Sequence, residues 1–214
     1  MNQIALPFDI DGEAEDSDYI ITEANKWVHE QLQNWQLWPH YTGILVGPEG
    51  GGKTAMAAQF LAHSGGSIED DAAQCADDAL FHRWNIANEE KTPLLLISRQ
   101  PVAEWGIKLP DLKSRLAASH MMELGAPDQP MIEGLLQKYF VRRGMSISED
   151  AIRFLGKRME RSYPNIQLLA RNMDQLASAR KKPITLAIAR SALMQLQDID
   201  DNVSTEADDM TGAK

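Results

Sequence analysis

Residues 43–54 read Gly-Ile-Leu-Val-Gly-Pro-Glu-Gly-Gly-Gly-Lys-Thr, and this stretch decides the fold. Its last eight residues match G-x-x-x-x-G-K-[ST] at every fixed position. The apolar run before the glycines predicts a buried strand, and the alanine-rich segment 54–63 predicts a helix. Glycines let successive backbone N–H groups converge on phosphate oxygens, and a helix start adds positive potential. We therefore predict a phosphate-binding loop, with Lys53 on the outer phosphates and Thr54 on Mg²⁺; its residues are Gly47, Pro48, Gly50, Gly51, Gly52, Lys53 and Thr54.

An acid pair after the next strand is the expected magnesium partner of this loop. Ile68 opens a short strand that runs into Glu69-Asp70-Asp71. We predict that Asp70 holds Mg²⁺ and that Asp71 polarises the attacking water; the alternative is that both are first-turn acids of the following helix. Little more than one helix and one strand separates Thr54 from Asp70. The spacing therefore predicts a parallel sheet that lacks one edge strand–helix unit.

The rest of the chain predicts an α/β part followed by an all-α part. Strands and helices alternate up to Gly125, as in a largely parallel sheet. The expected elements there are a helix from Glu23 to Asn34, the strand 43–47, the helices 77–88 and 110–116, and the strands 93–98 and 120–124. Helical periodicity then predicts four helices, with Ser148 as an N-cap, at 130–143, 148–162, 165–180 and 185–195. We expect a base domain over 19–126 and a helical domain over 127–195.

The acidic charge of the chain is concentrated at its ends. The net charge is −10, but residues 9–18 and 198–214 carry twelve acids, and without these stretches 19 acids face 20 bases. We expect residues 1–18 to be a peptide on an acidic tether and 196–214 to be a disordered acidic tail. One cysteine and the absence of a long apolar run argue against a disulfide framework and a membrane span. We therefore expect a cytoplasmic protein.

Taken together, these motifs resemble the Hda/DnaA-related AAA+ family over roughly residues 3–195. The fold that this resemblance implies is an AAA+ P-loop NTPase base with a four-helix lid. Residues 18–25 (DYIITEAN) resemble the family's N-linker, which implies that Tyr19, Ile20, Ile21 and Asn25 surround adenine. Residues 94–101 resemble the sensor 1 strand. Residues 109–116 (LPDLKSRL) resemble box VII, which implies that Arg115 is an arginine finger.

The sequence departs from the family pattern at two sensor positions. Arg99 stands where DnaA usually has Asp, and Gln167 stands at the sensor 2 arginine. Arg171 lies one helical turn after Gln167 and could replace that cation, or it could be a surface residue. We therefore expect a protein that binds ADP or ATP with Mg²⁺ but has weak or no intrinsic ATPase activity.

The N-terminal hexapeptide Gln3-Ile4-Ala5-Leu6-Pro7-Phe8 resembles the Q-L-x-L-P-L motif that binds the sliding clamp. The amide of Gln3 suits fixed hydrogen bonds, while Ile4, Leu6 and Phe8 are apolar anchors. Pro7 lowers the entropy lost on binding. The alternative is that this segment packs on its own domain as an edge strand.

The resemblance implies a negative regulator of DNA replication initiation. Such a protein would dock on the sliding clamp of DNA polymerase III and use Arg115 in trans to stimulate ATP hydrolysis by DnaA. Two rival functions remain: an autonomous P-loop ATPase acting as loader or remodeller, and a nucleotide-binding adaptor that sequesters partners. Because only a short acidic tail follows Met194, we expect neither a helix-turn-helix domain nor sequence-specific DNA binding. The sequence leaves the oligomeric state undecided, and a homodimer is one option.

Overall fold

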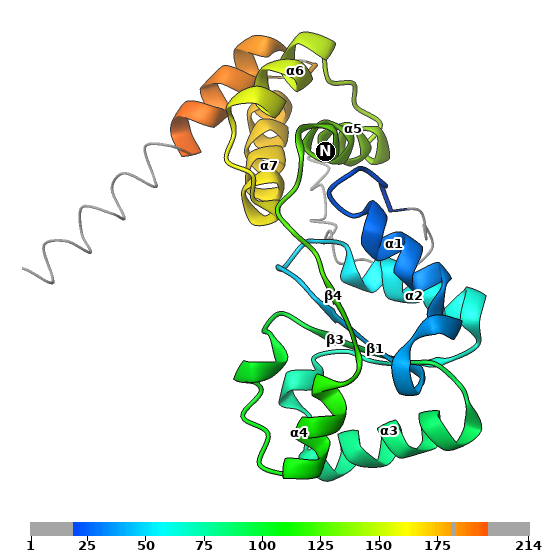
Figure 1. The fold of residues 1–214 in the computed structure, drawn as a ribbon. Helices are drawn as coiled ribbons and strands as arrows, with labels where there is room; N and C mark the ends of the chain where they lie inside the picture. Colours follow the sequence, from blue (N-terminus) through cyan, green and yellow to red (C-terminus); the bar gives the residue numbers. More distant parts are fainter. Residues whose placement is uncertain (1–18, 181–182, 197–214) are drawn as a thin grey trace, which may run out of the picture. The chain divides into compact units, whose positions relative to one another are not determined.

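The computed structural model describes residues 19–180 and 183–196 (Figure 1). They form two compact units: an α/β unit of residues 19, 28–47 and 52–123, and a helical unit of residues 20–27, 48–51 and 124–196. The helices and strands in chain order are α1 (Lys26–Gln33), β1 (Thr42–Val46), α2 (Lys53–Ser64), β2 (Ser67–Glu69), α3 (Asp77–Glu90), β3 (Leu94–Ser98), α4 (Pro110–Ala117), β4 (His120–Glu123), α5 (Gln129–Arg142), α6 (Glu149–Arg158), α7 (Tyr163–Arg180) and a last helix over residues 186–196. Short 3-10 turns are η1 (Trp35–Leu37), η2 (Pro39–Tyr41), η3 (Ala72–Gln74) and η4 (Val102–Glu104).

The sheet of the α/β unit has the strand order β2-β3-β1-β4, and every pair of neighbours is parallel. Strand β1, which leads into the glycine loop, is central: Ile44 lies opposite Leu96 of β3 and Met121 of β4. Strand β2, which leads into the acid pair, is only three residues long and lies at the edge. This is the shortened parallel sheet that the short spacing between the loop and the acid pair predicted.

Helices cover both faces of this sheet, which is why β1 and β3 read as continuous apolar runs. Ile44 and Leu96 pack on one face with Leu80 of α3 and with Leu112 and Leu116 of α4. Alternation along a strand turns the intervening side chains to the opposite face. Helices α1 and α2 lie on that side of the sheet (Figure 1). The expected α/β layer is therefore confirmed.

The helical unit has its own apolar core, formed by α5, α6, α7 and the last helix. Ser148 caps α6 as predicted, because its hydroxyl accepts a hydrogen bond from the N–H of Ala151. A single parallel bridge between Ile147 and Ile184 ties the start of α6 to the start of the last helix.

Helix boundaries differ from the prediction where proline and loop geometry decide them. The predicted helix 165–180 begins after Pro164, but α7 begins at Tyr163, so Pro164 lies in its first turn, where its missing N–H costs nothing. Helix α6 ends at Arg158, four residues before the predicted end. Within the described residues, no helix is long and apolar enough to span a bilayer.

Candidate functional site

The glycine loop joins the end of β1 to the start of α2, as the motif requires. Gly50 and Gly52 have φ values of +74° and +83°, a conformation that favours glycine. Helix α2 then begins at Lys53, and no side chain caps its first turn. The N–H groups of that turn therefore suit an anionic ligand. The ammonium of Lys53 donates to the carbonyl oxygen of Gly47 at 2.7 Å, so the lysine folds back over its own loop.

Two residues of α7 lie against the middle of the loop, within the helical unit. A Cβ built at Gly50 would lie 2.7 Å from Nε2 of Gln167 and 3.3 Å from Cβ of Tyr163. A Cβ at Gly51 would lie 3.1 Å from the carbonyl oxygen of Pro48. Any side chain at position 50 would therefore fill the space that Gln167 uses. The loop needs glycine for its backbone conformation and also for this close approach.

The chemistry of the loop fits a nucleotide phosphate with Mg²⁺. Thr54 is exposed at the start of α2, so its hydroxyl can serve as a hard oxygen ligand. Asp70 and Asp71 are both exposed directly after β2. The carboxylate of Asp70 accepts from the N–H of Asp71, whose φ is +50°. Among residues 19–180 and 183–196, no three His, Cys, Asp or Glu side chains form a metal cluster, so an ion here would share its coordination with phosphate oxygens and water.

The carboxylate of Glu69, directly before the acid pair, has a structural role. Glu69 forms an ion pair with Arg83 of α3 and accepts a hydrogen bond from the thiol of Cys75 at 3.3 Å. Burial and the neighbouring Glu69 carboxylate raise the pKa of the Cys75 thiol. This thiol is therefore a poor nucleophile.

The expected adenine segment is held in place by its own side chains. Asn25 is only 2% exposed: its Oδ1 accepts from the N–H of Thr22 at 2.8 Å, and its Nδ2 donates to the carbonyl of Ile20 at 2.8 Å. Asn25 therefore fixes the backbone of residues 20–25, whereas we expected it to contact the base. Ile20 packs on the helical core, and Ile21 is 48% exposed.

Tyr19, the first residue of this segment, contacts α1. Its hydroxyl lies 2.6 Å from Nδ1 of His29, and the two rings meet edge to face. Burial raises the pKa of Tyr19 to about 12. The tyrosine hydroxyl thus already has a hydrogen-bond partner in its own chain.

Asp128 ties the expected adenine segment to α5, and sequence reasoning missed this residue. One carboxylate oxygen caps α5 by accepting from the N–H of Met131 at 2.8 Å, and the other accepts from the N–H of Ala24 at 3.2 Å. In the sequence, an Asp two residues before a proline was the available sign of a helix cap. The contact with Ala24 left no sign, because the two residues lie 104 positions apart.

Arg115 is bound by its own chain through side chains of α3 and α4. Its guanidinium carbon lies 4.4 Å from the ring centre of Phe81 and 4.5 Å from that of Trp84, both on α3. It also donates to Asn85 and, at 3.0 Å, to Asp111 one turn earlier on α4. The side chain is 26% exposed. Phe81, Trp84 and Asn85 share one face of α3, which explains how they gather around one cation. The role of Arg115 in trans stays a prediction.

The remaining predicted residues divide into those that the structure describes and those outside its range. Arg171 is exposed on α7, and its charge acts on Tyr139. Arg99 is exposed directly after β3. The expected clamp-binding residues Gln3, Ile4, Leu6, Pro7 and Phe8 lie outside the described residues.

No protein-family model matches the sequence. Among solved structures, the chain is similar to domain III of the replication initiation protein DnaA from Thermotoga maritima, with a TM-score of 0.69 and 12% identity over 85% of this chain and 97% of that one. A replication initiator DnaA bound to AMPPCP and single-stranded DNA gives 0.57 and 14%, over 76% of this chain and 66% of the other. The Holliday junction branch migration motor RuvB of Thermotoga maritima gives 0.56 and 14%, over 81% and 68%.

These likenesses establish the fold. The chain has the fold of DnaA domain III and of RuvB, in which a base with a shortened parallel sheet precedes a helical lid. The identities are too low to carry substrate or partner from one protein to another.

Proposed function

We propose that this protein binds ATP or ADP through residues 47–54 and regulates the initiation of DNA replication. The observation that carries the proposal is the glycine loop: two glycines with positive φ lead into the uncapped start of α2, with Lys53 folded over the loop. This arrangement offers backbone N–H donors and one cation to a chain of phosphates. A similar fold in DnaA is bound to AMPPCP, which supports a nucleotide as the ligand.

In the bound state, Lys53 would exchange the carbonyl of Gly47 for a phosphate oxygen, because both are acceptors within reach of one flexible side chain. Thr54 and Asp70 would hold Mg²⁺, which supplies charge neutralisation between the phosphates. Asp71 would orient water. Gln167 lies beside Gly50 without a charge, so the chain lacks a lid cation at that position. We therefore expect weak or no hydrolysis by the protein alone.

The regulatory part of the proposal combines three features. The fold is similar to that of DnaA domain III. Residues 3–8 resemble a clamp-binding peptide, and Arg115 lies in residues 109–116, which resemble box VII. We propose that the peptide docks on the sliding clamp and that Arg115 stimulates ATP hydrolysis by DnaA. Since Arg115 is stacked on Phe81 and Trp84, its action on a partner requires the guanidinium to leave these rings.

The test is an assay of ATP hydrolysis by DnaA with clamp loaded on DNA, run with and without residues 1–8. A finger supplied in trans raises the rate by roughly 10³–10⁵. Arg115→Ala should abolish this stimulation while nucleotide and clamp binding persist. Arg115→Lys, which keeps the charge but loses the planar fork, should restore little. Lys113→Ala, at an exposed position of the same helix, serves as the matched control.

The same assay separates the two rival functions. Robust multiple-turnover hydrolysis by the protein alone would identify an autonomous ATPase. No stimulation by either the unmodified chain or Arg115→Ala, with binding to both partners intact, would leave a nucleotide-binding adaptor as the function.

A further inference from the structure

Opposite charges are segregated within residues 19–196, although the sum over these residues is close to zero. Residues 124–196 carry twelve lysines and arginines and six acids, a formal charge of +6. Residues 19–123 carry eight bases and thirteen acids, a formal charge of −5. The near-neutral balance of these residues thus conceals a strongly basic helical segment. Such a segregation is a reason to look for a polyanionic partner on that segment.

Part of this positive charge gathers around one aromatic ring on α6. The guanidinium carbon of Arg158 lies 4.6 Å from the ring centre of Phe154, and that of Arg190 lies 5.5 Å from the same centre. The two guanidinium carbons therefore cannot be farther apart than the sum of these two distances. Arg158 comes from α6 and Arg190 from the last helix, so the packing of two helices brings them together. Both side chains are exposed.

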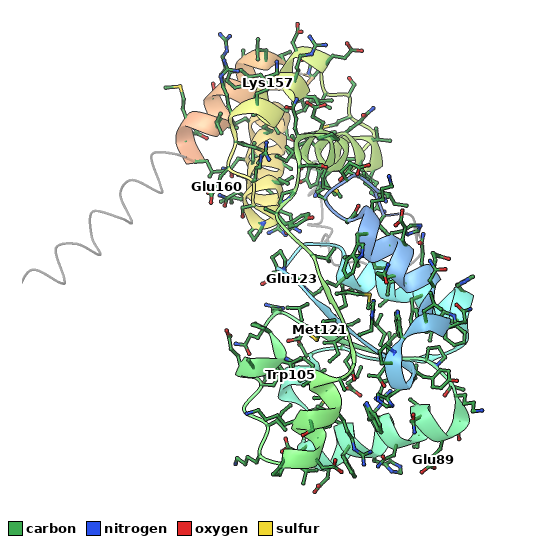
Figure 2. The ribbon with its side chains drawn as sticks, in the orientation of Figure 1. Glu89, Trp105, Met121, Glu123, Lys157 and Glu160 are labelled. Carbon is green, nitrogen blue, oxygen red and sulfur yellow. The ribbon has the colours of Figure 1, made fainter. Side chains whose placement is uncertain are left out.

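Two further cations extend this group along α6. Lys157 (labelled in Figure 2) follows Arg153 by one helical turn, and both are exposed. We call Arg153, Lys157, Arg158 and Arg190 the α6 basic face. Helical spacing places Phe154 between these residues on the surface of α6.

In the part of the chain that the structure describes, only one of the four cations of the α6 basic face, Arg153, has acidic partners. Arg153 lies 3.8 Å from Glu149 and 3.7 Å from Asp150, and both of these acids are highly exposed. Within the described ranges 19–180 and 183–196, Lys157, Arg158 and Arg190 take part in no ion pair.

Another arginine of the helical unit, Arg143, has a carboxylate partner. Arg143 also lies over an aromatic ring, that of Tyr139, but it pairs with Asp174 at 2.8 Å. Two arginines that share one ring without a carboxylate repel each other, because their separation is comparable with the Debye length of about 8 Å at physiological ionic strength. An anion placed between them would relieve this repulsion.

We infer that the α6 basic face binds the phosphate backbone of nucleic acid without reading its sequence. A guanidinium that lies flat on an aromatic ring keeps its N–H edge free to fork onto phosphate oxygens. The ring of Phe154 packs on the helical core and has both guanidinium groups beside it, so it is a poor apolar anchor for an acidic peptide. Phosphates that repeat along a strand match several cations spread over one helix face.

This inference does not depend on the proposed nucleotide and DnaA chemistry, since none of its four residues belongs to that machinery. The test is the affinity of the full chain for a short fluorescent DNA duplex of arbitrary sequence, measured by anisotropy over a series of salt concentrations. Non-specific contacts of this kind give dissociation constants of about 10⁻⁴–10⁻⁶ M at physiological salt. Affinity should change little when the duplex sequence is scrambled.

The deciding variant is Arg158→Ala/Arg190→Ala, which removes two charges from exposed positions. The slope of log K against log salt should become shallower by about 1.8, and affinity at low salt should fall roughly tenfold. Lys108→Ala/Lys113→Ala removes the same charge from exposed positions of the α/β unit and should leave the slope unchanged. Thermal melting of both variants checks that the fold is kept.

Three results would overturn the inference. The first is undetectable duplex binding by the unmodified chain, and the second is an equal loss of affinity in the arginine and lysine variants. The third is a polyglutamate peptide that binds as tightly as the duplex and is weakened by the same arginine variant. That result would assign the α6 basic face to an acidic protein.

Discussion

Gly50 shows how the conformation of the phosphate loop depends on a single residue. Its φ of +74° is strained for any L side chain, and a Cβ there would lie 2.7 Å from Nε2 of Gln167. We expect Gly50→Ala to destabilise the protein by about 1–2 kcal/mol. Nucleotide affinity should fall as well, because the loop must shift. Urea unfolding and titration with a fluorescent nucleotide measure the two effects.

Gly125→Ala is the matched control for that variant, because a Cβ at position 125 meets open space. Adding Gln167→Ala to Gly50→Ala removes the contact but leaves the backbone strain. A double variant with full nucleotide affinity would show that contact with Gln167, and not φ, limits the loop. An unchanged affinity in Gly50→Ala itself would contradict the geometry described here.

Tyr19 gives a prediction on pH. Burial raises the pKa of Tyr19 to about 12, above the ordinary value of about 10. The folded protein therefore binds this proton more tightly than the unfolded chain. The free energy of unfolding should be unaffected below about pH 10 and should decrease as the pH rises toward about 12.

The measurement is the urea midpoint as a function of alkaline pH, for the unmodified chain and for Tyr19→Phe. Burial also raises the pKa of Tyr139 and Tyr163, so the unmodified chain reports several groups at once. The difference between the two proteins isolates Tyr19. Parallel pH curves would show that Tyr19 is not protected from ionisation.

At the scale of elements, Asp128 joins the segment 20–25 to α5. It caps the helix through the N–H of Met131 and holds the N–H of Ala24 with its other oxygen. Asp128→Ala should lower the free energy of unfolding by about 1–2 kcal/mol, because a helix cap and a second hydrogen bond are lost together. If residues 20–25 contact a nucleotide base, nucleotide affinity should fall in the same variant.

Asp128→Asn separates the two roles of this residue, since the amide can still cap α5 through its single carbonyl oxygen. Its stability should lie between those of the unmodified chain and Asp128→Ala. Chemical denaturation gives the stabilities, and amide hydrogen exchange at Ala24 reports the second hydrogen bond. Exchange at Ala24 that is equally fast in all three proteins would contradict the contact.

The elements themselves were predictable because each has a local cause. The apolar runs of β1 and β3, the glycine that follows β1 and the hydroxyl of Ser148 act within a few residues of chain. Boundaries were less predictable. Pro164 suits a helix start as well as a break, and only the packing of α7 selects the former.

At the scale of the whole molecule, the proposed nucleotide should stabilise the protein by mass action. A ligand that binds only the folded state adds about 2.7 kcal/mol at a concentration one hundred times its dissociation constant. ADP or ATP with Mg²⁺ should therefore raise the melting temperature. Lys53→Ala should abolish that rise with little change in the melting temperature of the free protein.

Differential scanning fluorimetry with and without nucleotide checks this prediction. Lys91→Ala, at an exposed position after α3, is the matched control and should retain the full rise. An equal rise in Lys53→Ala would move the nucleotide away from the glycine loop. No rise in any protein would remove nucleotide binding from the proposed function.

The net charge can be counted from the sequence, but the sequence does not show which acids and bases lie beside one another. Summed over residues 19–196, the bases and acids nearly cancel. The structure places Arg158 and Arg190 over one ring and pairs Arg143 with Asp174. Whether a cation is compensated depends on which acid lies beside it, and composition does not record that.

The amino-acid sequence by itself determined the phosphate loop, the strand and helix on either side of it, and the change from an α/β unit to a helical one. These features follow from glycine conformation and from apolar periodicity, which act over a few neighbouring residues. Only the tertiary structure decided that Arg115 lies on Phe81 and Trp84, that Gln167 lies against Gly50, and that Asp128 holds Ala24. The partners in these contacts are distant in the chain, so the packing of whole helices determines which side chains meet.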